Sequence, residues 1–329
     1  MTIKYDNVYI DCSSTVAGPI EKEGPLNKYF DKTYDDFYMG EKSFEKGEIK
    51  MILDSVDILL KKSNKSTKDI DLFISGDLLN QITPSSYAAE KLKINYIGCY
   101  AACSTSTLGI ALASSLLQNK EINNCICTVS SNNSAAEKQY RNPVEYGTPK
   151  KDTSTFTATG AGSILLTNKK SKIKVESITL GKVLDYGISD PFNVGAAMAP
   201  SASYTISTHL KDMNRTPDYY DLIITGDLGK YGMSILKDLL KIEHNIKLGK
   251  NYNDCGCMLY DLKKQDVKAG ASGPTSSALV TYSYIFDLMK KGKLKKVLLV
   301  ATGALHSPTM LNQKLNIPSI SHAVSLEAL

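Results

Sequence analysis

The sequence has no long apolar run. Nowhere in its 329 residues do 18 apolar residues follow one another, which excludes an ordinary transmembrane helix. The N-terminal residues also lack a short apolar stretch behind basic residues, so no signal peptide is expected. We therefore expect cytoplasmic synthesis and a protein that reaches a membrane only by docking to an integral partner.

A concentrated basic surface is also missing. The formal net charge is +5, and the lysines are scattered through the chain instead of being grouped in one basic run. Proteins that bind nucleic acid usually have a basic patch interleaved with aromatic residues. The sequence therefore predicts no nucleic-acid partner.

A disulfide framework is absent as well, because seven cysteines is an odd number and their spacing is irregular. Two C-x-C pairs, at residues 125 and 127 and at residues 255 and 257, fall in strand-like or hairpin-like sequence. Structural zinc sites more often use cysteine pairs separated by two residues. We expect buried free thiols and no metal site.

What the sequence does contain is an alternation of strand-like and helix-like segments. Strands are expected at residues 70–75, 95–99, 126–130, 164–167, 174–180, 222–225, 297–302 and 320–326. Helices are expected at residues 48–61, 105–118, 197–211, 235–241 and 276–290. Such alternation is typical of α/β proteins whose mixed sheets are covered on both faces.

An internal repeat is visible in two places. The sequence DLFISGDL at residues 71–78 recurs as DLIITGDL at residues 221–228, an offset of 150 residues. The sequence CSTSTL at residues 103–108 aligns with PTSSAL at residues 274–279, now with an offset of 171 residues. Matches of both kinds indicate that the chain arose by duplication.

The helices expected after residues 104 and 275 are apolar or small on nearly every side. A helix that is apolar all round is buried all round. Two such helices related by duplication indicate a central helical layer between two sheets. We therefore expect an α/β protein with a five-layer αβαβα fold, built from two duplicated halves at residues 1–168 and 169–329.

The two halves differ by insertions. The increase in the offset from 150 to 171 places extra residues in the second half, at about residues 242–271. The first half inserts a polar, turn-rich segment at residues 131–155. Long loops in compact domains are often functional, and we expect this one to form a lid over a pocket.

Cys103 lies where a strand ends and one of the buried helices begins, in the sequence YAACSTS at residues 100–106. Free N–H groups and the positive end of the helix dipole stabilise a thiolate or any other anion at such a position. A nucleophilic cysteine, an anion-binding site and a plain buried thiol all fit this pattern.

The duplicated halves, the AACS motif and the late GASG and ATGAL motifs resemble those of the thiolase and ketoacyl-synthase superfamily. More closely, the chain resembles the family of stage V sporulation protein AD from spore-forming bacteria. The resemblance rests on segments spread from end to end: DKTYD at residues 31–35, SGDLLNQ at 75–81, ACSTS at 102–106, DPF at 190–192, AMAP at 197–200, LIITGDL at 222–228, DCG at 254–256 and VATGAL at 300–305.

The resemblance implies a thiolase-like fold and binding of dipicolinic acid (pyridine-2,6-dicarboxylic acid), alone or as its calcium chelate. It also implies a role in uptake of this acid into the developing spore. The protein would then lie peripherally at the spore inner membrane, beside the membrane subunits of the dipicolinate channel. Because the thiolase fold usually dimerises through a sheet edge, a homodimer is implied too.

The residues around Cys103 argue against condensation chemistry. Such enzymes need His and Asn, or two His, to move protons and stabilise an oxyanion. The chain has Asp227 and Pro274 where ketoacyl synthases of the acetyl-primed type place these partners. The thiolase pattern, GHP before GASG and a second late cysteine, is absent too, since no cysteine follows Cys257. We expect a binding protein with no catalytic residues, not an enzyme.

A small aromatic dianion requires cationic groups, N–H donors and a flat apolar wall. The lid segment offers Lys138 and Arg141 beside Tyr140 and Tyr146, although the two cations suit an exposed helical face equally well. Met198 either lines the pocket or fills the core. The predicted ligand-binding residues are Cys103, Ser104, Lys138, Arg141, Met198, Asp227 and His306.

Two other functions stay open. Cys103 with His306 as a replacement base describes an acyltransferase or condensing enzyme. A vestigial pocket on a subunit that docks a membrane channel describes an interaction protein. No cofactor such as NAD or ATP is expected, because GAG at residues 160–162 leads into a strand and not into a helix. The remaining histidines are expected to be structural: His209, His244 and His322.

Overall fold

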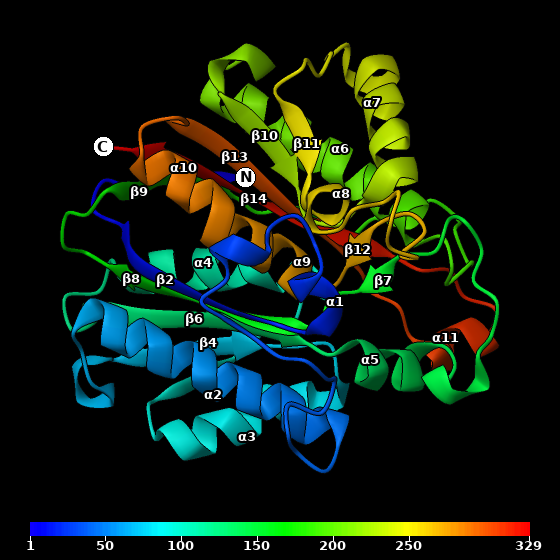
Figure 1. Cartoon of the computed structure of the whole chain (residues 1–329). Coiled ribbons are helices and arrows are strands. Elements are labelled where there is room, and N and C mark those ends of the chain that lie inside the picture. The colour runs from blue at the N-terminus through cyan, green and yellow to red at the C-terminus, as the bar shows by residue number, and fades with distance from the viewer.

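The main strands form one continuous mixed path through both halves of the chain (Figure 1). The computed structural model describes residues 1–329, the side chain of Val144 excepted. The strands on the path are β2 (Tyr9–Ala17), β4 (Leu72–Gly76), β5 (Tyr96–Gly98), β6 (Asn124–Ser131), β8 (Gly160–Thr167), β9 (Ile173–Thr179), β10 (Leu222–Thr225), β11 (Tyr252–Asp254), β13 (Lys296–Ala304) and β14 (Ser319–Ala328). Their order is β11-β10-β13-β14-β9-β2-β8-β6-β4-β5.

The strand order contains the same five-strand arrangement twice. From its free edge, the first half reads β5-β4-β6-β8-β2 and the second reads β11-β10-β13-β14-β9, and antiparallel pairing of β2 with β9 joins them. The repeated sequences lie on β4 and β10. Asp71 and Asp221, just before these strands, each accept backbone N–H bonds from two consecutive residues near the start of a neighbouring strand. The predicted duplication is therefore present in the fold.

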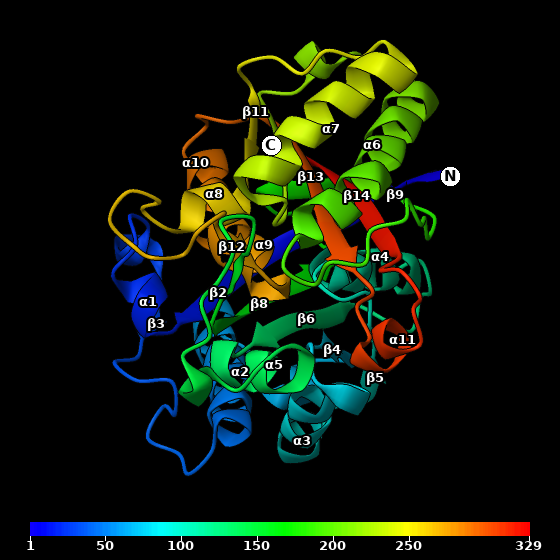
Figure 2. The same cartoon turned by 90° about the vertical axis from the view of Figure 1, so that its right-hand side faces the viewer.

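Helices cover both outer faces and fill the space between the two sets of strands (Figures 1 and 2). The outer helices are α2 (Phe44–Ser63) and α3 (Thr83–Leu92) on one side, and α6 (Val194–Met213) and α7 (Gly229–His244) on the other. The central layer contains α4 (Thr105–Leu116) and a second helix made of α9 (Pro274–Leu279), a π-helical turn (Val280–Ile285) and α10 (Phe286–Lys290). These are the five layers that the sequence predicts.

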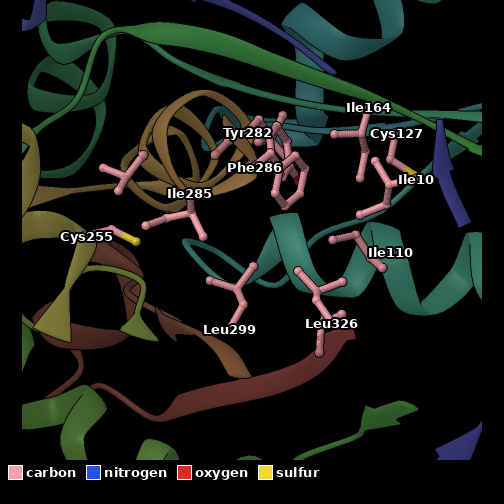
Figure 3. Close-up of a cluster of buried hydrophobic side chains, with 14 of the residues drawn as sticks. Ile10, Ile110, Cys127, Ile164, Cys255, Tyr282, Ile285, Phe286, Leu299 and Leu326 are labelled. Atoms are coloured by element: carbon pink, nitrogen blue, oxygen red, sulfur yellow. The ribbon is translucent and has the colours of Figure 1, made fainter. Parts of the chain in front are cut away.

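The central helices are buried because their side chains are small or apolar on every side. Ile110 of α4, Phe286 of α10 and Leu299 of β13 belong to one buried cluster (Figure 3). Ser106 and Ser277, which the 171-residue repeat relates, hydrogen-bond each other with 2.7 Å between their Oγ atoms. The duplicated helices therefore meet at equivalent positions.

Shorter elements connect the layers. They are β1 (Thr2–Lys4), α1 (Pro19–Lys22), β3 (Lys32–Thr33), α5 (Asn133–Tyr140), β7 (Phe156–Thr157), α8 (Cys255–Leu259), β12 (Ala271–Ser272) and α11 (Pro308–Asn312). Parallel pairing of β7 with β12 ties the end of the first-half insertion to the second half. Across the described residues, no helix is both long and apolar enough to cross a membrane.

Strand β2 is not predicted by the sequence pattern. Its middle residues, Ser13, Ser14 and Thr15, are polar, yet all three are buried. The hydroxyl of Ser13 donates to the carbonyl oxygen of Tyr282 at 2.7 Å, and that of Ser14 donates to the carbonyl oxygen of Ser55 at 2.6 Å. Because the two serine hydroxyls find partners on neighbouring helices, a polar sequence can occupy the middle of the sheet, although the buried Thr15 hydroxyl has no partner among the described atoms.

The insertion at residues 131–155 differs from the expected loop. Its first residue is the last residue of β6, the following residues form helix α5, and the rest is mostly irregular. Asn132 caps α5 by accepting the backbone N–H of Ser134 at 3.0 Å. The eight residues of α5 include three polar or charged side chains in a row, at residues 137–139, and no apolar period, so the sequence pattern favours a loop.

Candidate functional site

Cys103 lies in the sharp bend between β5 and α4, as the sequence predicts. The preceding residue, Ala102, has a φ of 48°, a left-handed conformation that residues other than glycine rarely adopt. The bend packs directly against β13, because a Cβ atom on Gly303 would lie 2.2 Å from the carbonyl oxygen of Ala101. This close packing holds the strained backbone and fixes the thiol at the head of the central helix.

The thiol of Cys103 faces the carboxylate of Asp227. Burial, and after it this negative charge, raises the pKa of the Cys103 thiol well above its usual value. Burial likewise raises the pKa of Asp227 to about 7. Asp227 accepts hydrogen bonds from the Thr302 hydroxyl at 2.8 Å and from the Gly273 N–H at 3.0 Å. A cysteine reacts as its thiolate, and this setting favours the protonated thiol of Cys103.

The position of Asp227 is itself fixed by a second carboxylate. Asp254 accepts the backbone N–H groups of Leu228 at 2.9 Å and Gly229 at 3.1 Å, and so holds the loop that follows β10. It also caps α8, the helix that contains Cys255. The seven cysteines are all free thiols, and no three potential metal-ligating side chains gather anywhere in the described part of the chain.

A small cavity of about 50 Å³ lies in front of Cys103. A buried water needs roughly 10–15 Å³ of such space, so the cavity is suited to a few waters and is too small for a substituted aromatic ring. Residues from both halves line it: Leu78, Tyr100, Ala102, Cys103, Ala136, Tyr140, Arg141, Thr157, Val194, Ser272, Gly273, Ala304 and His306.

A larger open groove of about 620 Å³ adjoins this cavity. The cavity and the groove share Tyr100, Tyr140 and His306. The Tyr140 hydroxyl donates to the carbonyl oxygen of Leu78 and lies 3.4 Å from the Tyr100 hydroxyl. The ring centroids of Tyr140 and His306 are 5.4 Å apart. These three aromatic side chains therefore form the wall between the cavity and the groove.

Arg141 borders the cavity from the end of α5. Its Nε donates to the carbonyl oxygen of Pro191 at 3.2 Å, and its Nη1 donates to Glu137. Burial, and after it the charge of Arg141, lowers the pKa of His306 to about 4. His306 is therefore neutral at pH 7, and its Nε2 is buried without a hydrogen-bond partner among the described atoms.

Four of the predicted site residues are close together. Cys103, Arg141 and His306 line the cavity, and Asp227 lies behind the thiol. Ser104 is fully buried, and its hydroxyl donates to the carbonyl oxygen of Ala301 at 2.9 Å. It therefore fastens the start of α4 to β13 and does not line the cavity.

Lys138 and Met198 lie outside the cavity. Lys138 forms an ion pair with Glu45 at 2.6 Å, and its side chain is 55% exposed. Arg141 is only three residues further on, but its backbone leaves the helical conformation, so the two side chains diverge. Met198 is fully buried in the core between α6 and the second-half strands. The geometry does not support a ligand contact for either residue.

The remaining buried histidines are structural, as expected. The ring nitrogens of His209 lie 2.7 Å from the Thr179 hydroxyl and 2.6 Å from the Tyr220 hydroxyl. Nδ1 of His322 accepts the Gly181 N–H at 3.2 Å. Burial lowers the pKa of both imidazoles to about 4.

Sequence reasoning missed three residues at the site: Tyr100, Glu137 and Lys150. Tyr100 directly precedes the AACS motif, and this proximity is a signal that could have identified it. Glu137 lies four residues before Arg141, the spacing at which opposite charges pair on a helix. Lys150 comes from the irregular part of the insertion, and no local pattern places it beside Glu137.

Known structures share the fold at low sequence identity. The structure of 3-oxoacyl-[acyl-carrier-protein] synthase III from Aquifex aeolicus VF5 matches with a TM-score of 0.59 and 14% sequence identity, and the match covers 97% of this chain and 99% of that one. Cerulenin-bound OleA from Xanthomonas campestris has a TM-score of 0.65 and 12% identity, covering 99% of this chain and 100% of that one. These likenesses establish a thiolase-like fold.

Sequence relatives are more specific. The family model for stage V sporulation protein AD matches residues 1–327. Stage V sporulation protein AD from Bacillus subtilis (strain 168) is 47% identical over 320 residues, which cover 97% of this chain and 94% of that protein. With nearly every residue inside both matches, the chain belongs to the stage V sporulation protein AD family.

Proposed function

We propose that the protein binds dipicolinate (pyridine-2,6-dicarboxylate), as the dianion or its calcium chelate, without converting it. By doing so it supports uptake of this acid into the developing spore. The supporting observation is the Cys103 cavity, where the thiol faces the Asp227 carboxylate and Arg141 borders the same space. Membership of a sporulation family supports the biological setting.

The groups around the cavity match a planar dianion. The guanidinium fork of Arg141 suits a carboxylate, and Tyr100 and Tyr140 offer flat aromatic walls. His306 adds a ring nitrogen that has no other partner among the described atoms. Because the cavity is too small for a pyridine ring with two carboxylates, the ligand must take space now filled by Tyr140 and His306. Their displacement would join the cavity to the open groove.

One observation favours a second function, an acyltransferase or condensing enzyme. Asp227 has a pKa of about 7 and faces Cys103, so its ionised form could accept the thiol proton. Against this, the raised pKa of Cys103 opposes thiolate formation, and Pro274 occupies the start of α9 where an amide donor is needed. Incubation with several acyl-CoA donors followed by intact-mass measurement separates the two functions. An adduct lost in Cys103→Ala would favour the enzyme.

The assembly that we propose is a homodimer, peripheral at the spore inner membrane and beside the membrane subunits of the dipicolinate channel. Strand β5 ends the sheet of the first half and pairs only with β4, so its other edge is open to a second strand. Sedimentation of the purified protein tests the dimer. A monomer at micromolar concentration would contradict it.

Isothermal titration calorimetry with dipicolinate, with and without calcium, tests the binding proposal. Arg141→Ala should weaken binding by about tenfold or more, because a charge-assisted hydrogen bond to a carboxylate is lost. Lys138→Ala is the matched control, since it removes the same charge from the same helix but outside the cavity. No heat at millimolar dipicolinate, or equal losses in both variants, would contradict the proposal.

A further inference from the structure

The chain has two arginines, Arg141 and Arg215, and they are held differently. Arg215 donates from both Nη atoms to the carboxylate of Glu176, at 2.7 and 2.5 Å, and also to the Tyr220 hydroxyl at 3.0 Å. Its guanidinium lies 3.8 Å from the ring centroid of Tyr219. Arg215 is thus held through both Nη atoms in a structural network and serves as an internal reference.

Arg141 is held from one side only. Nε donates to Pro191 and Nη1 donates to Glu137, while Nη2 has no hydrogen-bond acceptor within the described residues. The side chain is 9% exposed, and it lines the Cys103 cavity. A guanidinium has five N–H donors in a fixed plane. The two that are occupied therefore orient the plane and leave the others for a ligand.

Glu137 is the acid that holds this arginine. Its side chain is 4% exposed, so its carboxylate is nearly removed from solvent. It lines a second small cavity of about 200 Å³, on the lid side of α5, together with Lys150. The Lys150 Nζ lies 3.8 Å from Oε1 of Glu137, the same oxygen that accepts from Arg141.

These three side chains form a cluster of two cations and one anion. If Glu137 faced Arg141 alone, its charge would offset that of the arginine, and the cavity would offer a dianion little attraction. Lys150 supplies the second positive charge, so the cluster keeps a net charge of +1 beside the cavity. The acid can therefore fix the arginine without removing its attraction for an anion.

We propose that Glu137 is a positioning residue, which holds Arg141 with its free N–H groups toward the Cys103 cavity while Lys150 offsets the acid's charge. This inference rests on the proposed function, because it concerns how the site binds a dicarboxylate. If Glu137 acted only through its charge, removing that charge would change the affinity for the ligand in the opposite direction. Removing a negative charge next to a dianion site should then tighten binding.

Glu137→Gln separates the two roles, because it removes the charge and keeps the shape. Selective ¹⁵N labelling of arginine gives side-chain signals from two residues only, and Arg141→Lys assigns them. In the ligand-free Gln variant we expect the Nε–H of Arg141 to exchange with solvent roughly tenfold faster, because a neutral amide restrains a guanidinium less than a carboxylate does. The Arg215 signal should not change.

Titration with dipicolinate completes the test. We expect the Glu137→Gln variant to bind several-fold more weakly than the wild type, and the Lys138→Ala control to bind equally well. Unchanged Arg141 exchange in the variant, or equal or tighter binding, would overturn the positioning role. Absence of binding by the wild type would instead contradict the proposed function, while the exchange measurement without ligand still decides whether Glu137 restrains Arg141.

A second variant guards against misfolding of the first. Lys150→Gln leaves Glu137 to Arg141 alone, so we expect Arg141 to stay protected while dipicolinate binds several-fold more weakly through loss of charge. Faster exchange at Arg141 in this variant would contradict the assigned roles. The Arg215 signal reports in every sample whether the fold is intact.

Discussion

At Cys103, burial and the neighbouring charge of Asp227 act together to raise the pKa of the thiol. Asp227 and its repeat counterpart Asp77 occupy the same place after equivalent strands. Asp77 accepts from the N–H of Leu79 and from both the N–H and the hydroxyl of Ser85, so its role is structural. Asp227 also fixes its own loop, yet it faces the thiol. The same duplicated residue has therefore acquired a second effect, that of suppressing the thiolate.

Replacing Asp227 by Asn should make Cys103 more reactive. The change keeps a side chain of the same shape but removes the negative charge that raises the thiol pKa. A drop of one pKa unit gives about tenfold more thiolate at pH 7, and we expect alkylation by iodoacetamide to accelerate by about that factor. Peptide mass measurement gives the rate at Cys103. Equal rates in both proteins would show that Asp227 does not control the thiol.

The same substitution should change how stability depends on pH. The pKa of Asp227 is raised from 3.8 to about 7 in the fold, so folding favours the protonated acid. This stabilising contribution is complete below pH 3.8 and is lost as the pH rises through 7.

The Asn side chain does not titrate, so the Asp227→Asn variant should become more stable relative to the wild type as the pH rises and the wild-type carboxyl ionises. Between pH 5 and pH 7 the gain should be about 2 kcal/mol, and little should be added above pH 7, where the wild-type carboxyl is already ionised. Thermal or urea unfolding at several pH values measures it. A constant difference from pH 5 to pH 8 would mean that Asp227 is not buried as the protonated acid.

Single residues were predictable where a motif fixes the backbone. Cys103 was predicted from its position between a strand end and a buried helix, and Asp227 was predicted beside it because the resemblance to ketoacyl synthases implies a partner at that position. Arg141 was predicted from composition, and Lys138 beside it was predicted for the same reason. Only the geometry separates them, because the backbone departs from the helix at Arg141.

At the level of elements, the packing of β8 against α9 depends on glycine. A Cβ atom on Gly162 would lie 2.8 Å from Cβ of Ala278 and 3.0 Å from the ring of Tyr282. This glycine lies inside strand β8, where it allows the strand and the helix to approach closely. In α4, by contrast, a Cβ on Gly109 would meet its nearest atom at 3.7 Å.

Two substitutions test this packing. Gly162→Ala should destabilise the fold by about 1–3 kcal/mol through overpacking. Gly109→Ala should be neutral or should stabilise by up to about 1 kcal/mol, because it replaces glycine inside a helix at a site with room. Urea unfolding of both variants compares them directly. A similar effect of the two substitutions would contradict the contact between β8 and α9.

Elements with a clear hydrophobic period were predicted well, and those stabilised by polar contacts were not. The predicted strand at residues 222–225 matches β10 in both bounds. Strand β2 was missed because buried serines and a threonine occupy its middle. Helix α5 was missed because its polar side chains follow no apolar period, and its cap by Asn132 is the only local signal.

At the scale of the whole molecule, the site lies where the duplicated halves meet. Cys103 and Arg141 belong to the first half, whereas Asp227, Gly273 and His306 belong to the second. The sequence predicts the five-layer fold because a duplication constrains both halves at once. It does not predict the size of the cavity or the aromatic wall, because these depend on how loops from different halves pack together.

A crystal structure of the protein grown with dipicolinate is the most direct test of non-catalytic binding at Cys103. We predict the ligand in the cavity with one carboxylate on Arg141, the Tyr140 and His306 side chains displaced toward the groove, and an unmodified thiol. Dipicolinate bound elsewhere with the cavity unchanged, or a covalent adduct on Cys103, would contradict this prediction.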